Sequence, residues 1–174
     1  MGLETPGIEG IDPVAETAIR ALYQRILDAW NNQDAADLAA SFRKNCLLVG
    51  FDGSQMVDRA EVESTLATIF AEYPTGLFLS IVRSVRSLTP EVATLHAVVG
   101  MMPRGKSELI PNVNAVQVMT AVQTEGVWLA AALQTTPAAF HGCPELAAQL
   151  TEELQALLPL GEGSSSSSCN ELPE

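Results

Sequence analysis

Four β-rich runs fill most of the second half of the chain, and they constrain the fold more than any other feature of the sequence. The runs cover about residues 77–88, 92–102, 113–123 and 127–135. They are separated by Thr89-Pro90, by a loop from Pro103 to Pro111, and by Glu125-Gly126, which are turn signals. Because strands joined by such connections usually pair with their sequence neighbours, we predict an antiparallel meander.

Helical patterns precede the meander. Asp12-Pro13 has the form of an N-cap followed by proline at the first helical position, and apolar residues then recur at helical spacing. This pattern predicts a helix over about residues 13–32. Asp34, with Asp37 three residues later, predicts a second, shorter helix, whose apolar face includes Leu38 and Phe42.

A short strand, a hairpin and a third helix connect this helical pair to the meander. We predict them, in order, at Cys46–Val49, at Asp52-Gly53, and between Asp58 and Tyr73-Pro74. A last helix begins at Pro144, with leucines at 146, 150, 154 and 157 along one stripe. We divide the chain into an N-terminal extension (1–11), one domain (12–160) and a serine-rich tail (161–174), which we expect to be disordered.

Helices followed by a long meander predict an α+β fold in which helices cover one face of a curved antiparallel sheet. The strands, however, are apolar on both parities. In one run Val92 and Val98 alternate with Ala93 and Leu95, whereas a sheet with one solvated face alternates cleanly between apolar and polar residues. We therefore expect a second copy of the chain to cover the second face, giving a homodimer.

The charge balance excludes several classes of partner. The 9 Lys and Arg residues against 21 Asp and Glu give a net charge of -12, which repels phosphate backbones and anionic lipid surfaces. We expect neither a nucleic acid nor a membrane as partner, and no run approaches the ~18 apolar residues of a membrane span. The sequence shows no export segment, and its three cysteines have no paired spacing. We expect a cytoplasmic protein.

Three motifs carry a family resemblance: Ala29-Trp30-Asn31-Asn32-Gln33-Asp34, the turn 88–93 leading into 96–101, and the segment Gln134 to Gly142. Over about residues 12–158 the chain resembles the nuclear-transport-factor-2-like superfamily, which includes ketosteroid isomerases and SnoaL-like polyketide cyclases. Within it, the chain is most similar to the SgcJ/EcaC family. That family usually has Asn where this chain has Thr135.

The resemblance implies a cone-shaped pocket between the helices and the sheet. Ketosteroid isomerases use a carboxylate base and a tyrosine donor in such a pocket. Counted from the shared motif, those two positions hold Gly50 and Ile26 in this sequence. Neither side chain can supply a proton or accept one, so the isomerase mechanism does not carry over.

Gly100 to Ser107 fits the phosphate-binding pattern G-x-x-x-x-G-K-[ST]. A phosphate-binding loop must open a helix whose N-terminal amides face the phosphates. Here Pro111 interrupts the segment that follows, and the chain then enters another strand. We interpret the octapeptide as a hairpin loop and expect no specific ATP binding.

His96 is the best single acid or base candidate, because it lies within an apolar strand and can titrate near neutrality. The structural alternative is a neutral histidine hydrogen-bonded to a neighbour. We expect ligand contacts from six further side chains: Trp30, Asn114, Gln117, Trp128, Gln134 and Thr136. For the two tryptophans the alternative is a plain core position, which is the more common one for aromatic residues in helices and strands. With two distant histidines and no spaced carboxylates, the sequence predicts no metal site, and we expect no cofactor.

The sequence leaves three functions open. The leading one is a cytoplasmic homodimer that binds a small, largely apolar molecule in the cone. The second is an enzyme, an isomerase, cyclase or cofactor-free oxidoreductase, acting on a polyketide-like or aromatic molecule. The third is a non-catalytic association module. A buried ionisable pair would favour the enzyme, a cavity without titratable groups the carrier, and a filled cone the association module.

Overall fold

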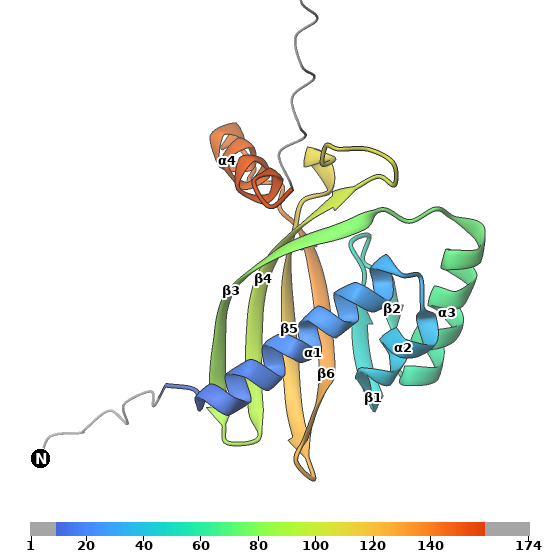
Figure 1. The fold of residues 1–174 in the computed structure, drawn as a ribbon, viewed down its shortest axis with the longest axis vertical. Helices are drawn as coiled ribbons and strands as arrows, with labels where there is room; N and C mark the ends of the chain where they lie inside the picture. Colours follow the sequence, from blue (N-terminus) through green and yellow to red (C-terminus); the bar gives the residue numbers. More distant parts are fainter. Residues whose placement is uncertain (1–9, 159–174) are drawn as a thin grey trace, which may run out of the picture.

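The computed structural model describes residues 10–158 and shows helices packed against a strongly curved sheet (Figure 1). The elements are α1 (Pro13–Asn31), α2 (Ala35–Ala40), β1 (Phe42–Val49), β2 (Gln55–Met56), α3 (Arg59–Glu72), β3 (Leu77–Thr89), β4 (Val92–Met102), η1 (Pro111–Val113), β5 (Ala115–Thr124), β6 (Val127–Pro137) and α4 (Pro144–Gln155). The predicted α+β class is confirmed. Residues 1–9 of the predicted extension and the whole predicted tail lie outside the described residues.

The helices begin where the sequence places their caps. The Asp12 carboxylate accepts a hydrogen bond from the Ala15 amide at 3.0 Å, and the Asp34 carboxylate accepts one from the Asp37 amide at 2.9 Å. Asp58 caps α3 in the same way. Each carboxylate satisfies an amide that has no partner within its helix. Across residues 10–158, no helix is long and apolar enough to cross a membrane.

The six strands form one sheet in the order β2-β1-β6-β5-β4-β3. The predicted meander from β3 to β6 is antiparallel throughout, but β1 pairs with β6 in parallel, so the sheet is mixed. β1 also begins at Phe42 rather than Cys46. The sequence pattern assigned Phe42 to the apolar face of α2, but α2 ends at Ala40 and Phe42 is instead a fully buried residue of the strand.

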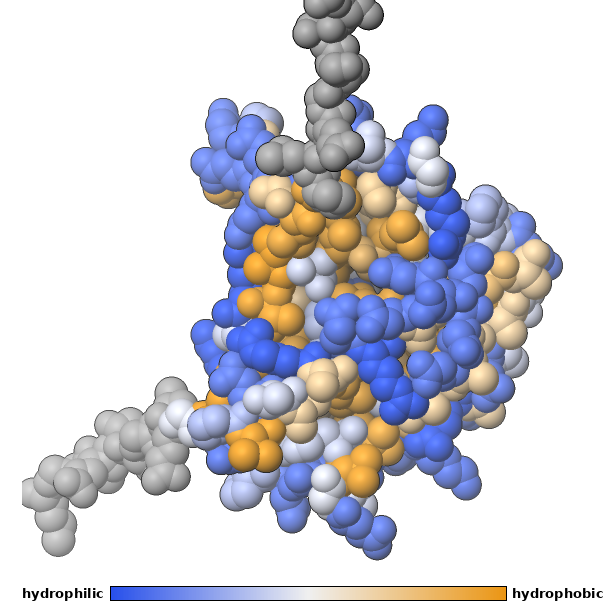
Figure 2. Space-filling view, viewed as in Figure 1, coloured by the Kyte–Doolittle hydropathy of each residue, from blue (hydrophilic) through white to orange (hydrophobic). Residues whose placement is uncertain are grey.

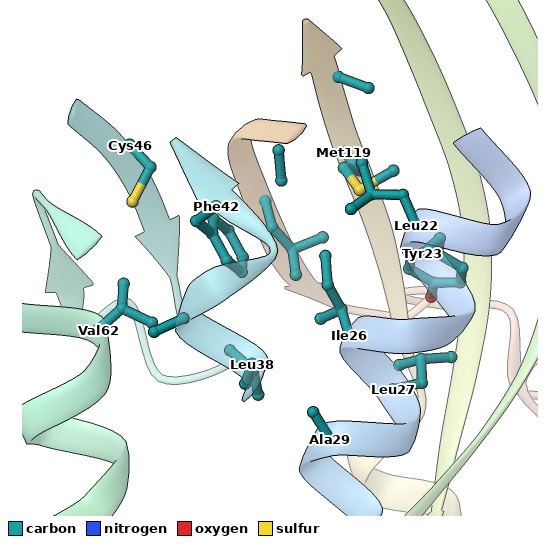
Figure 3. Packing of buried hydrophobic residues seen from close by; sticks show 14 of the residues in the cluster. Leu22, Tyr23, Ile26, Leu27, Ala29, Leu38, Phe42, Cys46, Val62 and Met119 are labelled. Atoms are coloured by element: carbon teal, nitrogen blue, oxygen red, sulfur yellow. The ribbon is translucent and has the colours of Figure 1, made fainter. Parts of the chain in front are cut away.

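The main core lies between α1 and the inner face of the sheet. Ile19, Tyr23 and Ile26 of α1 pack in one cluster with buried residues of β4 and β5 such as Leu95 and Met119. Figure 3 shows Met119 beside Leu22 and Tyr23. The side of α1 that faces solvent is largely hydrophilic (Figure 2), as expected for a helix that buries one stripe.

The last helix packs against the opposite face of the sheet. Leu150 and Leu154 of α4 form a second buried cluster with Val98 of β4 and Leu109. The strands are thus apolar on both faces in part because α4 covers one end of the outer face. The rest of that face remains open in the described chain, and Val118 on it is 44% exposed.

The loop after β4 has no feature of a nucleotide-binding site. β4 ends at Met102, and the next regular element is η1, a 3-10 helix of 3 residues. The Lys106 amide donates to the carbonyl of Pro103 at 3.1 Å, which closes a turn. The interpretation of Gly100 to Ser107 as a hairpin loop is confirmed.

Candidate functional site

A cavity of about 270 Å³ opens between the helices and the inner face of the sheet. Apolar side chains make most of its wall: Ile26, Leu27 and Trp30 from α1, Leu66 and Ile69 from α3, and Leu133 from β6. Trp30 lies one helical turn beyond Ile26 and Leu27, at the i+4 and i+3 positions, so these α1 side chains point to the same side of the helix. Two polar side chains of the sheet, Gln117 and Thr135, also face the cavity.

Trp30 is fixed at the wall by its indole and by aromatic neighbours. Its Nε1 donates a hydrogen bond to the carbonyl of Gly76 at 3.0 Å. The ring lies 5.3 Å from Phe70 in an edge-on arrangement and 5.0 Å from Phe78, measured between ring centroids. These distances are those of favourable aromatic pairs. These contacts hold the tryptophan ring at the wall, and its indole N–H is already used.

A chain of hydrogen bonds joins α1 to the cavity. The Tyr23 hydroxyl donates to Oε1 of Gln117 at 2.5 Å, and Nε2 of Gln117 donates to Oγ1 of Thr135 at 3.1 Å. Gln117 and Thr135 are direct partners across β5 and β6, so the strand pairing itself brings them together. Tyr23 and Gln117 are almost completely buried.

The Tyr23 hydroxyl keeps its proton at neutral pH and acts as a hydrogen-bond donor. Burial raises the pKa of its hydroxyl well above the ordinary value, and a hydrogen bond with Ser80 offsets only part of this rise. The phenol therefore stays protonated at neutral pH, since desolvation penalises the charged form. Its proton lies on the hydrogen bond to Gln117 and is not presented to the cavity, whose lining does not include Tyr23.

The turn between β1 and β2 supplies polar groups at another part of the cavity. Gly50, Asp52 and Ser54 belong to the lining. Hydrogen bonds from the Ser54 hydroxyl and the Ser54 amide lower the pKa of the Asp52 carboxyl. A Cβ added at Gly50 would lie 2.8 Å from the Ser54 hydroxyl oxygen, so a side chain at that position would require the Ser54 side chain to move.

Solved structures share this arrangement of helices and sheet. A domain of unknown function with a cystatin-like fold from Nostoc punctiforme aligns with a TM-score of 0.70 and 20% identity, over 84% of this chain and 98% of that chain. An NTF-2-like protein of unknown function from Shewanella oneidensis aligns with a TM-score of 0.56 and 14% identity, over 70% and 98%. The chain has the nuclear-transport-factor-2-like fold.

Other structures with this fold carry enzyme-like names. A ketosteroid isomerase-like protein from Erwinia carotovora aligns with a TM-score of 0.57 and 15% identity, over 71% of this chain and 95% of that chain. Identities this low concern the fold alone. No protein-family model matches the sequence. No curated protein matches it.

Within the nuclear-transport-factor-2-like fold, two of the seven predicted site residues line the cavity: Trp30 and Gln117. The structure corrects the position expected for His96 and Gln134. Both are exposed on the outer face of the sheet, where each is paired with Val118 in the strand register. The physical reason is parity: side chains along β4 alternate between faces, and Leu95 takes the inner one.

The remaining predicted contacts also lie away from the cavity. Thr136 is exposed on the outer face, one residue beyond Thr135. Trp128 is buried in the main core without reaching the cavity. Asn114 is buried near α4, where its Nδ2 donates to the Thr151 hydroxyl at 2.8 Å. Gly50 and Ile26, the positions carried over from the ketosteroid isomerases, do both line the cavity.

The sequence interpretation missed Tyr23 and Thr135 as members of the site. Tyr23 stands four residues after Ile19 and three before Ile26, a helical spacing that could have indicated its place on the buried stripe of α1. Thr135 could have been noticed because it differs from the resembling family, which usually has Asn at that position. Their connection through Gln117 could not be read from the sequence, since Tyr23 and Gln117 are 94 residues apart.

A larger groove, of about 790 Å³, runs along α4 near the end of β6. Most of the residues along it are exposed, such as Pro137, Ala139 and Ala148. A ligand there would leave much of its surface in water, whereas small-molecule sites bury most of theirs. We therefore take the smaller cavity in the core as the candidate site.

Proposed function

We propose that the protein binds a small, largely apolar molecule in the core cavity. The observation that carries this proposal is the composition of the wall: apolar side chains from helices and sheet surround the space, and the two polar side chains Gln117 and Thr135 converge on it from adjacent strands. Small-molecule sites have this character, an apolar lining with a few placed polar groups.

The size of the cavity limits the ligand. Ligand pockets typically span ~300–1,000 Å³, so a cavity of about 270 Å³ lies just below that range. A molecule of about one or two rings matches this volume.

The lining favours a carrier over an acid–base enzyme. Asp52 is its titratable side chain, and hydrogen bonds to Ser54 hold the pKa of Asp52 down. General acid–base catalysis needs a group whose pKa lies near the working pH, and Asp52 is shifted away from that range. His96, the acid or base expected from the sequence, lies on the other face of the sheet.

The alternative of an isomerase, cyclase or cofactor-free oxidoreductase therefore lacks a placed acid or base among the residues that line the cavity. The alternative of a purely associating module would leave the cavity without a role. Binding is the function that uses both the apolar wall and the Tyr23, Gln117 and Thr135 chain.

The proposal is tested with naphthalene as an apolar probe, followed by saturation-transfer NMR. In the variant Ile69→Trp a large side chain from α3 fills part of the cavity, and the matched control Leu88→Trp adds the same group at an exposed site. We expect the wild type and the control to bind naphthalene and the Ile69 variant to lose binding. Equal signals in all three folded proteins, or none in any, would refute the proposal.

A further inference from the structure

The hydrogen-bond distances fix which way the Gln117 amide is turned. The separation of 2.5 Å from the Tyr23 oxygen lies within the range of O–H···O bonds and is too short for N–H···O. The separation of 3.1 Å from the Thr135 oxygen is normal for N–H···O and long for O–H···O. The amide oxygen therefore faces Tyr23, and the amide nitrogen faces Thr135.

This orientation leaves two hydrogen-bond donors at the cavity. A glutamine amide has two N–H groups, and Thr135 takes one of them. The Thr135 oxygen accepts that bond, so its own O–H is still available. Among the hydrogen bonds found for the described residues, none uses the second Gln117 N–H or the Thr135 O–H as a donor. Both side chains line the cavity.

The amide oxygen, by contrast, is engaged by Tyr23. Because Tyr23 remains protonated, this bond persists across the physiological pH range. Gln117 Oε1 and Thr135 Oγ1 each accept one hydrogen bond already, and an oxygen can leave its second lone pair free more readily than a buried donor can stay unpaired. What this part of the wall lacks is an acceptor for the second Gln117 N–H and the Thr135 O–H. Groups with such unused donors are costly to bury without an acceptor.

The charges around the cavity further limit the class of ligand that it can bind. The residues that line the cavity include no Lys, Arg or His, so a buried carboxylate or phosphate on the ligand would find no cation to balance it. Asp52 in the lining and the net charge of -12 add repulsion for anions. Asp52, in the turn between β1 and β2, could attract a cationic group, but at the part of the cavity formed by the sheet such a group would meet the donors of Gln117 and Thr135. The site suits a neutral molecule.

We infer that the ligand is a neutral, largely apolar molecule with a carbonyl oxygen or an equivalent acceptor, which receives hydrogen bonds from the Gln117 amide and the Thr135 hydroxyl. This inference rests on the proposed function, because it assigns the chemical class of the molecule that fills the same cavity. Gln117 and Thr135 are the residues that select the acceptor, and Tyr23 positions the Gln117 amide.

Three compounds of one size separate the inference from the function on which it rests. Tetralin is the hydrocarbon, α-tetralone carries one carbonyl, and α-tetralol carries a hydroxyl. Since the carbonyl can accept hydrogen bonds that tetralin cannot form, we expect α-tetralone to bind roughly tenfold more tightly than tetralin. Calorimetry or ligand-observed NMR with the purified full chain gives the three dissociation constants.

Thr135→Val keeps the shape of the side chain but removes both the hydroxyl donor and the oxygen that accepts from Gln117 Nε2, so only a Gln117 amide that Thr135 no longer holds can donate to the ligand. Thr135→Ser restores the hydroxyl. We expect the valine variant to lose several-fold in affinity for α-tetralone and little for tetralin, and the serine variant to recover the preference. If all three compounds bind equally, or if α-tetralol binds best, the inference is overturned while binding in the cavity stands. If tetralin and α-tetralone both fail to bind the folded protein, the proposed function fails with it.

Discussion

The hydroxyl of Tyr23 lies 2.5 Å from Oε1 of Gln117, so a residue of the first helix holds a side chain of the sheet that faces the cavity. Both residues are buried, and Gln117 passes the contact on to Thr135. The hydrogen-bonded residues Tyr23, Gln117 and Thr135 thus belong both to the buried part of the domain and to the polar part of the candidate site. Changes at Tyr23 should affect stability and ligand preference together.

Tyr23→Phe should destabilise the domain. The change leaves the buried Gln117 oxygen without its donor, and an unsatisfied buried polar group costs about 1–3 kcal/mol. Urea unfolding followed by circular dichroism measures the loss. Tyr73→Phe is the matched control, because Tyr73 is 61% exposed, and its stability should remain at the wild-type value. A Tyr23 variant as stable as the control would contradict the assigned bond.

Stability should also fall at high pH because of Tyr23. Its folded pKa is raised by burial, whereas an unfolded tyrosine titrates near ~10. Below that pH both states keep the proton and the contribution is complete. Above it the unfolded chain loses the proton first, so the free energy of unfolding should decrease by about 1.4 kcal/mol per pH unit until the folded pKa is reached.

The same urea experiment, repeated at about pH 9 and about pH 11, isolates this effect. Other groups also titrate in this interval, so the informative quantity is the difference between wild type and Tyr23→Phe. We expect the wild type to lose more stability than the variant between the two pH values. Parallel losses in both proteins would show that Tyr23 ionises normally.

The sequence predicted the architecture better than the site, and particular residues show why. Caps such as Asp12 and Asp34 are local signals, and the helices begin there. The cavity depends on which parity of each strand faces α1, and alternation alone does not decide this. Gln117 was expected to contact a ligand and lines the cavity, whereas His96, expected as the acid or base of the same site, lies on the outer face.

Two further features depended on contacts between distant segments. The parallel pairing of β1 with β6 joins Leu48 to Leu133, and no turn signal relates strands so far apart in the chain. The sequence interpretation explained the apolar residues of the outer face by a second copy of the chain. In the structure, α4 of the same chain packs on that face and buries Val98. Within the motif Ala29–Asp34, Asn31 has a structural role. Its side chain donates a hydrogen bond to the carbonyl of Phe78 and accepts one from the amide of Phe78.

Leu154→Ala should loosen α4 from the sheet. Leu154 is fully buried in the cluster beneath α4, and truncating a buried leucine costs about 2–5 kcal/mol. We expect faster hydrogen exchange over residues 144–155, with the amides of β4 and β5 still protected. Leu157→Ala serves as control, since Leu157 is 48% exposed. Unchanged exchange in the Leu154 variant would contradict the packing.

The open part of the outer face should associate with a second copy of the chain. α4 covers the end near Val98, while Val118 and Leu47 remain exposed among the described residues. We expect light scattering at micromolar concentration to report twice the chain mass, and Val118→Asp to give the single mass. A wild type that remains monomeric at this concentration would remove the support for a dimer through this face.

Methyl NMR of the full chain during a titration with naphthalene tests the central claim most directly. The account predicts that the methyl signals of Ile26 and Leu133, which line the cavity, shift in a saturable way while those of Val118 on the outer face stay in place. If the cavity methyls do not move, or if only Ala147 in the groove along α4 responds, the core cavity is not the binding site and the account is contradicted.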